Sequence, residues 1–132
     1  MENRLTKQER LNKQNAIQSL FKKGTSLKAR PFKTLFIVEE SDAEAPVRVL
    51  FVVPKRNLKL AVDRNRMKRL MREVYRKNKS GINEAAVSAG KTVTLALIFT
   101  GHKPIAYSTV EDKIILILQR LQKTLINETS NS

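Results

Sequence analysis

A run of closely spaced arginine, lysine and asparagine residues lies in the middle of the chain. Their side chains are of the types that bind phosphates. These residues are Lys55, Arg56, Arg64, Asn65, Arg66, Lys68, Arg69, Arg72 and Arg76. A planar guanidinium can hold a phosphate through two hydrogen bonds and can also stack on an exposed base. The residue types and their spacing therefore predict a surface that binds nucleic acid.

The positive charge of the chain is concentrated in this region. The formal net charge is +14 over 132 residues. The stretch from Lys55 to Lys79 holds eleven lysines and arginines against two acids, a net charge of +9, which leaves +5 for all other residues. Such a charge repels itself unless a polyanion neutralises it, so nucleic acid is the expected partner. An anionic membrane is the competing polyanion, but no segment approaches the roughly 18 apolar residues of a transmembrane helix.

The spacing of apolar residues predicts that a helix over Asp63–Lys79 presents these cations on one side. Its apolar positions recur at helical intervals and are Met67, Leu70, Met71, Val74 and Tyr75. Asp63 is the expected N-cap, and Ser80–Gly81 is the expected end. Arg64 and Arg66 fall in the first turn, where cations oppose the helix dipole at a cost of about 0.3–1 kcal/mol each. This placement favours a phosphate-binding role over a solvated, arginine-rich face.

The rest of the chain predicts a small sheet with packed helices. The other expected elements are a helix over 12–23, a strand over 32–40, an acidic turn over 41–46, a strand over 47–53 buried on both faces, a cationic loop over 54–60, a short helical turn or loop over 82–90, a strand over 92–99, a helix opening at the capping box Ser108–Glu111, and a frayed tail over 127–132. This order predicts an α/β (α+β) two-layer sandwich forming one domain over residues 1–132.

Catalytic groups and metal ligands are sparse. The chain has no cysteine, so it has no disulfide, zinc knuckle or thiol nucleophile. His102 is the only histidine and is expected in a solvated loop, and the acids of the turn over 41–46 lack the spacing of a metal site. The first ten residues carry two Glu and no apolar run, so we do not expect a secretory signal. We expect a cytoplasmic protein.

The cationic helix resembles a motif of one known family, the bacterial ribonuclease P protein component. The family pattern R-N-R-x-K-R-x-x-R, preceded by Ala-Val, is matched by residues 61–72, Ala-Val-Asp-Arg-Asn-Arg-Met-Lys-Arg-Leu-Met-Arg. Further similar positions are Arg10-Leu11, Ile17, Leu20-Phe21, Gly24-Thr25-Ser26, the strand from Phe32, and Pro54-Lys55-Arg56. The resemblance covers about residues 4–125 and is weakest after Gly81.

The resemblance implies a subunit of a ribonucleoprotein enzyme that removes the 5′ leader of precursor tRNA. In that family the RNA subunit is catalytic, and magnesium is bound mainly by the RNA subunit and the substrate. By position, the nine cationic and amide residues from Lys55 to Arg76 would bind the catalytic RNA. Ile17, Phe21, Lys33 and Leu35 would line a leader-binding cleft. The implied fold has the order α-β-β-(β)-α-β-α with a left-handed β-α-β crossover, a fold also found in a ribosomal protein domain.

Two positions depart from the family pattern, and other functions stay open. The family often has aromatic residues where Ile17 and Leu35 stand, and base stacking on an aromatic can contribute about 1–3 kcal/mol. Phe21 and Leu35 could instead be ordinary core residues. Asn57–Leu60 replaces a turn that commonly contains glycine. A ribosomal or RNA-assembly protein without an enzymatic role is the main alternative. A helix-turn-helix DNA binder is disfavoured, because a strand and Pro54 precede the helix.

Overall fold

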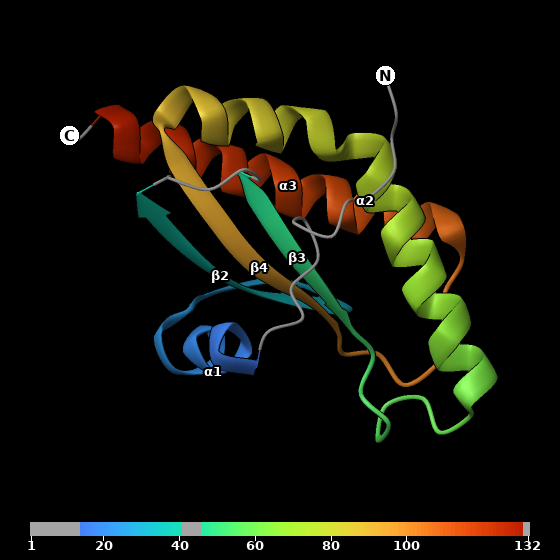
Figure 1. Ribbon diagram of the computed structural model, residues 1–132. Helices are drawn as coiled ribbons and strands as arrows, with labels where there is room; N and C mark the ends of the chain where they lie inside the picture. The colour runs from blue at the N-terminus through green and yellow to red at the C-terminus, as the bar shows by residue number, and fades with distance from the viewer. Residues whose placement is uncertain (1–13, 41–45, 131–132) are drawn as a thin grey trace.

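The described residues form a four-stranded sheet with helices α2 and α3 on one face and α1 on the other (Figure 1). This computed structural model describes residues 14–40 and 46–130, without the side chains of 14–17, 19 and 128–130. The elements are α1 (Gln14–Lys23), β1 (Thr25–Ala29), β2 (Phe32–Glu40), β3 (Val47–Val52), α2 (Ala61–Ala89), β4 (Lys91–Phe99) and α3 (Tyr107–Ser130). The predicted α+β class is confirmed. The predicted turn over 41–46 lies outside the described residues except Pro46.

The strand order is β1-β2-β4-β3, so the sheet is mixed. β1 and β4 pair with β2 in antiparallel orientation, whereas β3 and β4 are parallel neighbours connected by α2. This is the β-α-β unit that the family resemblance implies. β1 was not among the strands predicted from the apolar runs, because its five residues include only one large apolar side chain, Leu27.

β3 was expected to be buried on both faces, and that expectation is wrong. β3 lies at an edge of the sheet, and four of its six residues are only half-buried. The central strand is β4, in which seven of nine residues are buried. The sequences of β3 and β4 are both apolar runs. Such a run does not indicate which of the two strands has a neighbouring strand on each side.

α2 is longer than predicted at both ends. It begins at Ala61 after the N-cap Leu60, whose side chain makes no capping hydrogen bond, so Asp63 lies in the first turn and is not the cap. The helix then continues through Ser80–Gly81, and the predicted end there is wrong. Residues 82–89 extend the helix because Ile82 and Ala86 carry its buried stripe onward. Gly90, with a φ of 66°, ends it in the left-handed conformation that favours glycine.

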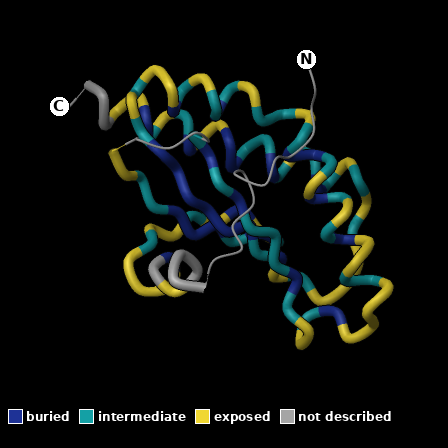
Figure 2. Tube along the Cα trace, in the orientation of Figure 1, coloured by how far each residue is buried: buried dark blue, intermediate teal, exposed yellow. Residues whose placement is uncertain are grey.

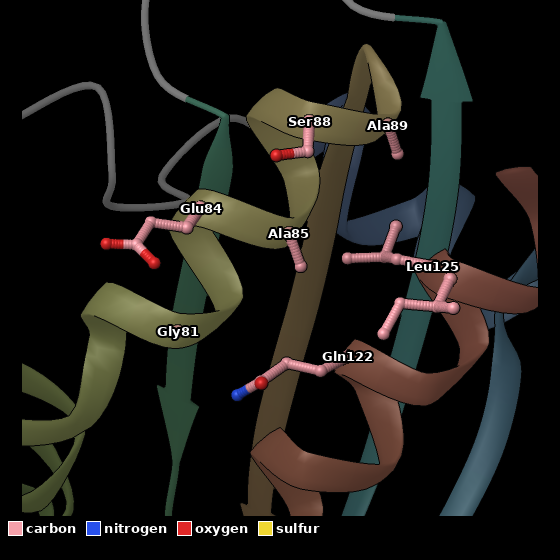
Figure 3. Close-up of a pocket in the computed structure, with 8 residues that line it drawn as sticks. Gly81, Glu84, Ala85, Ser88, Ala89, Gln122 and Leu125 are labelled. Atoms are coloured by element: carbon pink, nitrogen blue, oxygen red, sulfur yellow. The ribbon is translucent and has the colours of Figure 1, made fainter.

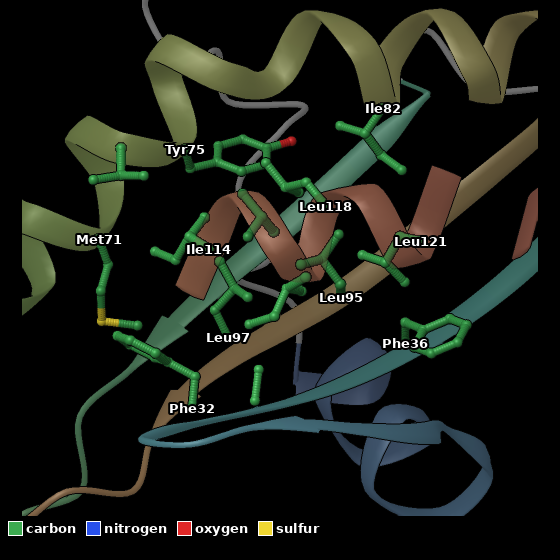
Figure 4. Close-up of a cluster of buried hydrophobic side chains, with 14 of the residues drawn as sticks. Phe32, Phe36, Met71, Tyr75, Ile82, Leu95, Leu97, Ile114, Leu118 and Leu121 are labelled. Carbon is green, nitrogen blue, oxygen red and sulfur yellow. The ribbon is translucent and has the colours of Figure 1, made fainter. Parts of the chain in front are cut away.

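One hydrophobic core joins α2 and α3 to their face of the sheet. Figure 4 shows Met71, Tyr75 and Ile82 of α2 meeting Leu95 and Leu97 of β4, with side chains of α3 and β2 completing the cluster. In Figure 2, dark blue positions recur along α2 between more exposed ones, as expected for a helix with one apolar face.

α3 also differs from its predicted bounds. It begins at Tyr107, and the backbone N–H groups of Thr109 and Val110 donate to the Ala106 carbonyl. Ser108 therefore lies inside the first turn and is not the cap. The tail expected from residue 127 is helical up to Ser130, and residues 131–132 lie outside the described part of the chain.

Candidate nucleic-acid interface

The first half of α2 separates an apolar face from a polar face, as its periodicity predicts. Met67, Met71, Val74 and Tyr75 are each at most 1% exposed. The polar residues between them turn away from this core: Asn65, Arg66, Arg69 and Arg72 are exposed, and Lys68 is half-buried. Packing of the apolar face on the core therefore fixes the direction in which the cations point. The four exposed polar side chains lie where a polyanion can reach them.

Arg64 differs from the other arginines of this helix because its guanidinium contacts the chain's own backbone. One terminal nitrogen donates to the carbonyls of Leu58 and Lys59, at 2.9 and 2.8 Å. These bonds tie the first turn of α2 to the loop that precedes it, over residues 54–60. They also place a cation near the start of the helix, where the dipole alone would disfavour it. The motif alone predicts only RNA binding for Arg64, so these backbone hydrogen bonds were not expected from the sequence.

Arg76 is paired within α2. Its guanidinium donates two hydrogen bonds to the carboxylate of Glu73, at 2.6 and 3.2 Å, and Lys77 lies 3.6 Å from the same carboxylate. The hydrogen bond to Arg76 lowers the pKa of Glu73 and raises the pKa of Arg76. Arg76 therefore offers a polyanion less free charge than its neighbours Arg69 and Arg72.

The cationic surface extends beyond α2 onto two loops at the carboxyl ends of β3 and β4. Lys55 and Arg56 are exposed in the first loop, and the Asn57 side chain donates to the Gly101 carbonyl in the second at 3.2 Å. A shallow pocket lies between the loops and the start of α2, and it is lined by Arg56, Asn57, Leu58, Lys59, Leu60, Asp63, His102 and Pro104. His102 is exposed, as expected, but it shares this pocket with two cations. This proximity could not be predicted from the sequence, because it depends on the parallel pairing of β3 with β4.

The four residues assigned to a leader cleft are placed differently from one another. Phe21 on α1 is 60% exposed, and Lys33 on β2 is half-buried. Leu35 is only 8% exposed and clusters with Leu20 of α1 and Ala96 of β4, so it packs beneath α1 as core. The side chain of Ile17 lies outside the described residues. Lys33 and Leu35 share the α1 face of the sheet, since strand residues two apart point the same way.

The described residues offer little else for chemistry. No group of three or more His, Cys, Asp or Glu side chains in that part of the chain is arranged to hold a metal ion. Across the same residues, no helix has the length and apolar character needed to cross a bilayer. The cationic surface is thus the main chemical feature of the described structure.

The chain is similar to known proteins over most of its length. The family model described as Ribonuclease P matches residues 5–122. The ribonuclease P protein component of Porphyromonas gingivalis is 30% identical over 127 residues, which is 96% of this chain and 88% of that relative. The component of Chlorobium phaeobacteroides is 45% identical over 80 residues, covering 58% of this chain and 55% of the relative.

Solved structures show the same fold. The RNase P protein of Thermotoga maritima superposes with a TM-score of 0.68 at 27% identity, covering 85% of this chain and 96% of that one. The RNase P protein of Staphylococcus aureus gives a TM-score of 0.67 at 23% identity, covering 85% and 94%. The chain therefore belongs to the ribonuclease P protein family, and it is a protein subunit of the enzyme that cleaves precursor tRNA.

Proposed function

We propose that this chain binds the RNA subunit of ribonuclease P through the cationic side of α2 and the adjoining loop over 54–60. The observation that carries the proposal is the division of α2 into a core face and a polar face. The residues proposed to contact the RNA are Lys55, Arg56, Arg64, Asn65, Arg66, Lys68, Arg69, Arg72 and Arg76. Exposed arginines on a fixed helix suit an RNA backbone, because they neutralise phosphates without needing a particular base sequence.

These nine residues would not contribute equally. Arg66, Arg69 and Arg72 are exposed, and no hydrogen bond or ion pair is found for them among the described residues. They are the strongest candidates for direct phosphate contacts. Arg64 would act mainly by holding the loop over 54–60 against α2, which positions Lys55 and Arg56 beside the helix. Arg76 would contribute less, because Glu73 already binds its guanidinium.

The second part of the proposal is that the 5′ leader of precursor tRNA lies on the α1 face of the sheet. Phe21 supports this, since an aromatic side chain 60% exposed beside a sheet can stack on an unpaired base. Lys33 supplies a cation on the same face. Leu35 would act as the buried floor of this surface, and Ile17 keeps the role that the family resemblance implies.

The proposed magnesium binding, domain organisation and cellular location are taken from the family resemblance. Magnesium would be bound mainly by the RNA subunit and the substrate, with the protein strengthening binding by neutralising nearby phosphates. The whole chain would act as a single domain in the cytoplasm, where precursor tRNA is processed. In this proposal the RNA subunit, and not the protein, catalyses cleavage of the phosphodiester bond.

A reconstitution assay tests the proposal. The purified chain is mixed with a bacterial ribonuclease P RNA and a precursor tRNA at a magnesium concentration too low for the RNA to act alone. We expect removal of the leader that neither the protein nor the RNA achieves separately. If the protein binds the RNA and yet never restores cleavage, the proposed roles fail and the alternative of a ribosomal or assembly protein is favoured.

A further inference from the structure

The second halves of α2 and α3 form an open groove that the proposed RNA contacts do not use (Figure 3). Its volume is about 410 Å³. The α2 side of the groove consists of small residues, and the α3 side carries two larger ones. These residues are Gly81, Ala85, Ser88 and Ala89 on α2, and Gln122 and Ile126 on α3. A recess of this size accepts apolar side chains of another molecule.

The same surface also presents an apolar side chain of its own. Ile126 lines the groove and is 59% exposed, whereas its neighbour Leu125 is only 1% exposed. One patch of the molecule therefore combines an apolar recess with an exposed apolar side chain that fits such a recess. A patch with both features is complementary to a copy of itself, which is the requirement for a two-fold symmetric contact.

The positive charge of the chain is lowest around this groove. Residues 81–89 and 121–130 together contain one lysine and two glutamates, a net charge of −1, whereas the stretch over 55–79 carries +9. The two helices run in the same direction here, and neither has a basic residue in its last turn, so the negative ends of their dipoles are not neutralised (Figure 1). Ala85 lies about 28 Å along α2 from Arg66, at 1.5 Å per residue. A contact at the groove therefore leaves the cationic side of α2 uncovered.

The two sides of the groove carry opposite charges. Glu84 is exposed on the α2 side, and Lys123 is exposed on α3, directly after Gln122. Among the described residues no ion pair is found for either side chain. In a two-fold contact each residue meets its counterpart's partner twice. Glu84 of one copy would then pair with Lys123 of the other, and Lys123 of the first copy with Glu84 of the second.

We propose that two copies of this chain associate through this groove, with Ile126 of each copy inserted into the groove of the other and Glu84 of each paired with Lys123 of the other. The groove extends over nine residues of α2 and five of α3. A contact this short buries less than the roughly 1,200 Å² of a stable complex, so the association is weak and reversible. The inference does not depend on the proposed function, because the groove and the cationic side occupy different parts of α2.

The test measures self-association of the purified full chain without RNA by sedimentation equilibrium, from about 5 to about 500 µM protein, the range of a weak contact. The sodium chloride concentration is about 150 mM, at which the Debye length of about 8 Å weakens long-range repulsion more than contacts between neighbouring charges. The variants Glu84→Lys and Lys123→Glu are measured separately and as an equimolar mixture. Each variant alone places like charges opposite each other, whereas a mixed pair restores both ion pairs. We expect the mixture to associate about tenfold more tightly than either variant alone.

Two controls separate the groove from general charge and hydrophobicity. Each charge swap changes the net charge of +14 by two, to +16 and +12, so the mixture keeps the average of the natural chain. Asp112→Lys mixed with Lys22→Glu has the same net charges at exposed positions outside the groove and should gain nothing on mixing. Ile126→Ser should weaken association of the natural chain about three- to tenfold. Val62→Ser changes a 70% exposed residue at the other end of α2 and should leave association unchanged.

Two results would overturn the inference. A natural chain that stays monomeric over the whole concentration range does not associate through the groove, which then serves another partner or none. A mixture that associates no more tightly than its two components shows that Glu84 and Lys123 do not meet across a contact between copies. Thermal melting of each variant checks folding. If a charge variant proves unstable, the comparison of Ile126→Ser with Val62→Ser decides the question.

Discussion

Arg64 and Arg66 flank Asn65 in the same motif, yet their guanidinium groups have different surroundings. Arg64 is half-buried and bonds to the carbonyls of Leu58 and Lys59, whereas Arg66 is exposed on the polar side of α2. A hydrogen bond from a charged donor contributes about 1.5–3 kcal/mol when buried and less when solvent reaches it. Within one motif, Arg64 can therefore stabilise the fold, whereas Arg66 is available to bind RNA.

This difference gives a prediction for a matched pair of variants. Arg66→Ala should weaken assembly with the RNA subunit and lower the salt dependence of binding by somewhat less than one unit of slope, because about one phosphate contact is lost. Its stability should change by less than about 0.5 kcal/mol. Arg64→Ala should instead lose about 1–2 kcal/mol of stability. Urea unfolding and RNA titrations at several salt concentrations measure the two effects.

Controls accompany this pair. Arg69→Ala should behave like Arg66→Ala, because it is exposed on the same side of the helix. Lys123→Ala removes a cation from α3 and should change neither stability nor the salt slope appreciably. An unchanged slope for both Arg66→Ala and Arg69→Ala would show that the polar side of α2 does not contact the RNA.

At the scale of elements, the uninterrupted course of α2 past Ser80–Gly81 depends on α3. The second half of α2 packs along α3, and Figure 3 shows Gly81 and Ala85 of α2 facing Gln122 and Leu125 of α3 across an open groove. Ile82 and Ala86 are fully buried in this half. Burial against α3 thus offsets the low helix propensity of glycine, which costs about 0.8–1 kcal/mol relative to alanine.

Two glycine substitutions at either end of this segment should have opposite effects. A Cβ on Gly81 would lie 2.8 Å from the amide nitrogen of Gln122, the far end of a flexible side chain that can shift. Gly81→Ala should therefore be neutral or stabilise the protein by up to about 1 kcal/mol. Gly90→Ala should destabilise it by about 1 kcal/mol, because residue 90 has a φ of +66°.

Chemical denaturation of both variants measures these effects. If Gly81→Ala lowers the free energy of unfolding by more than about 1 kcal/mol, the Gln122 side chain has no alternative position. The added methyl group then overpacks the contact between α2 and α3. Equal stability of Gly90→Ala and the natural protein would contradict the left-handed cap at the end of α2.

At the scale of the whole molecule, the charge of +14 opposes folding unless it is screened or neutralised. More than half of it lies between Lys55 and Lys79, on one helix and its preceding loop. The compact state brings these cations closer together than the unfolded chain does. A polyanion bound only to the folded state would relieve this repulsion and stabilise the fold.

The free protein should consequently gain thermal stability as salt is added. Raising the sodium chloride concentration from about 50 to about 500 mM shortens the Debye length from about 14 to about 4 Å and weakens the repulsion. We expect the Tm to rise over this range when no RNA is present. We also expect it to rise at low salt on addition of the RNA subunit. Circular dichroism during heating measures both, and a Tm that falls with added salt would contradict the argument.

The sequence by itself determined the features that depend on neighbouring residues. The alternation of apolar and cationic residues in α2 specified which side would be buried, and Met67, Met71, Val74 and Tyr75 are buried as expected. The bounds of β2 agree with the prediction over Phe32–Glu40. The motif within residues 61–72 indicated the family, because its residue types and their spacing can be recognised in the sequence without knowledge of any tertiary contact.

Only the tertiary structure decided the features that depend on residues far apart in the chain. Packing on α3 allows α2 to continue past Gly81. Strand pairing places β4 inside the sheet and β3 at its edge. The same pairing placed Arg48 across the sheet from Ile37. The turn of the Arg64 side chain toward Leu58 belongs to this class as well. Local propensity is weak compared with burial and strand pairing, so these long-range contacts set the outcome.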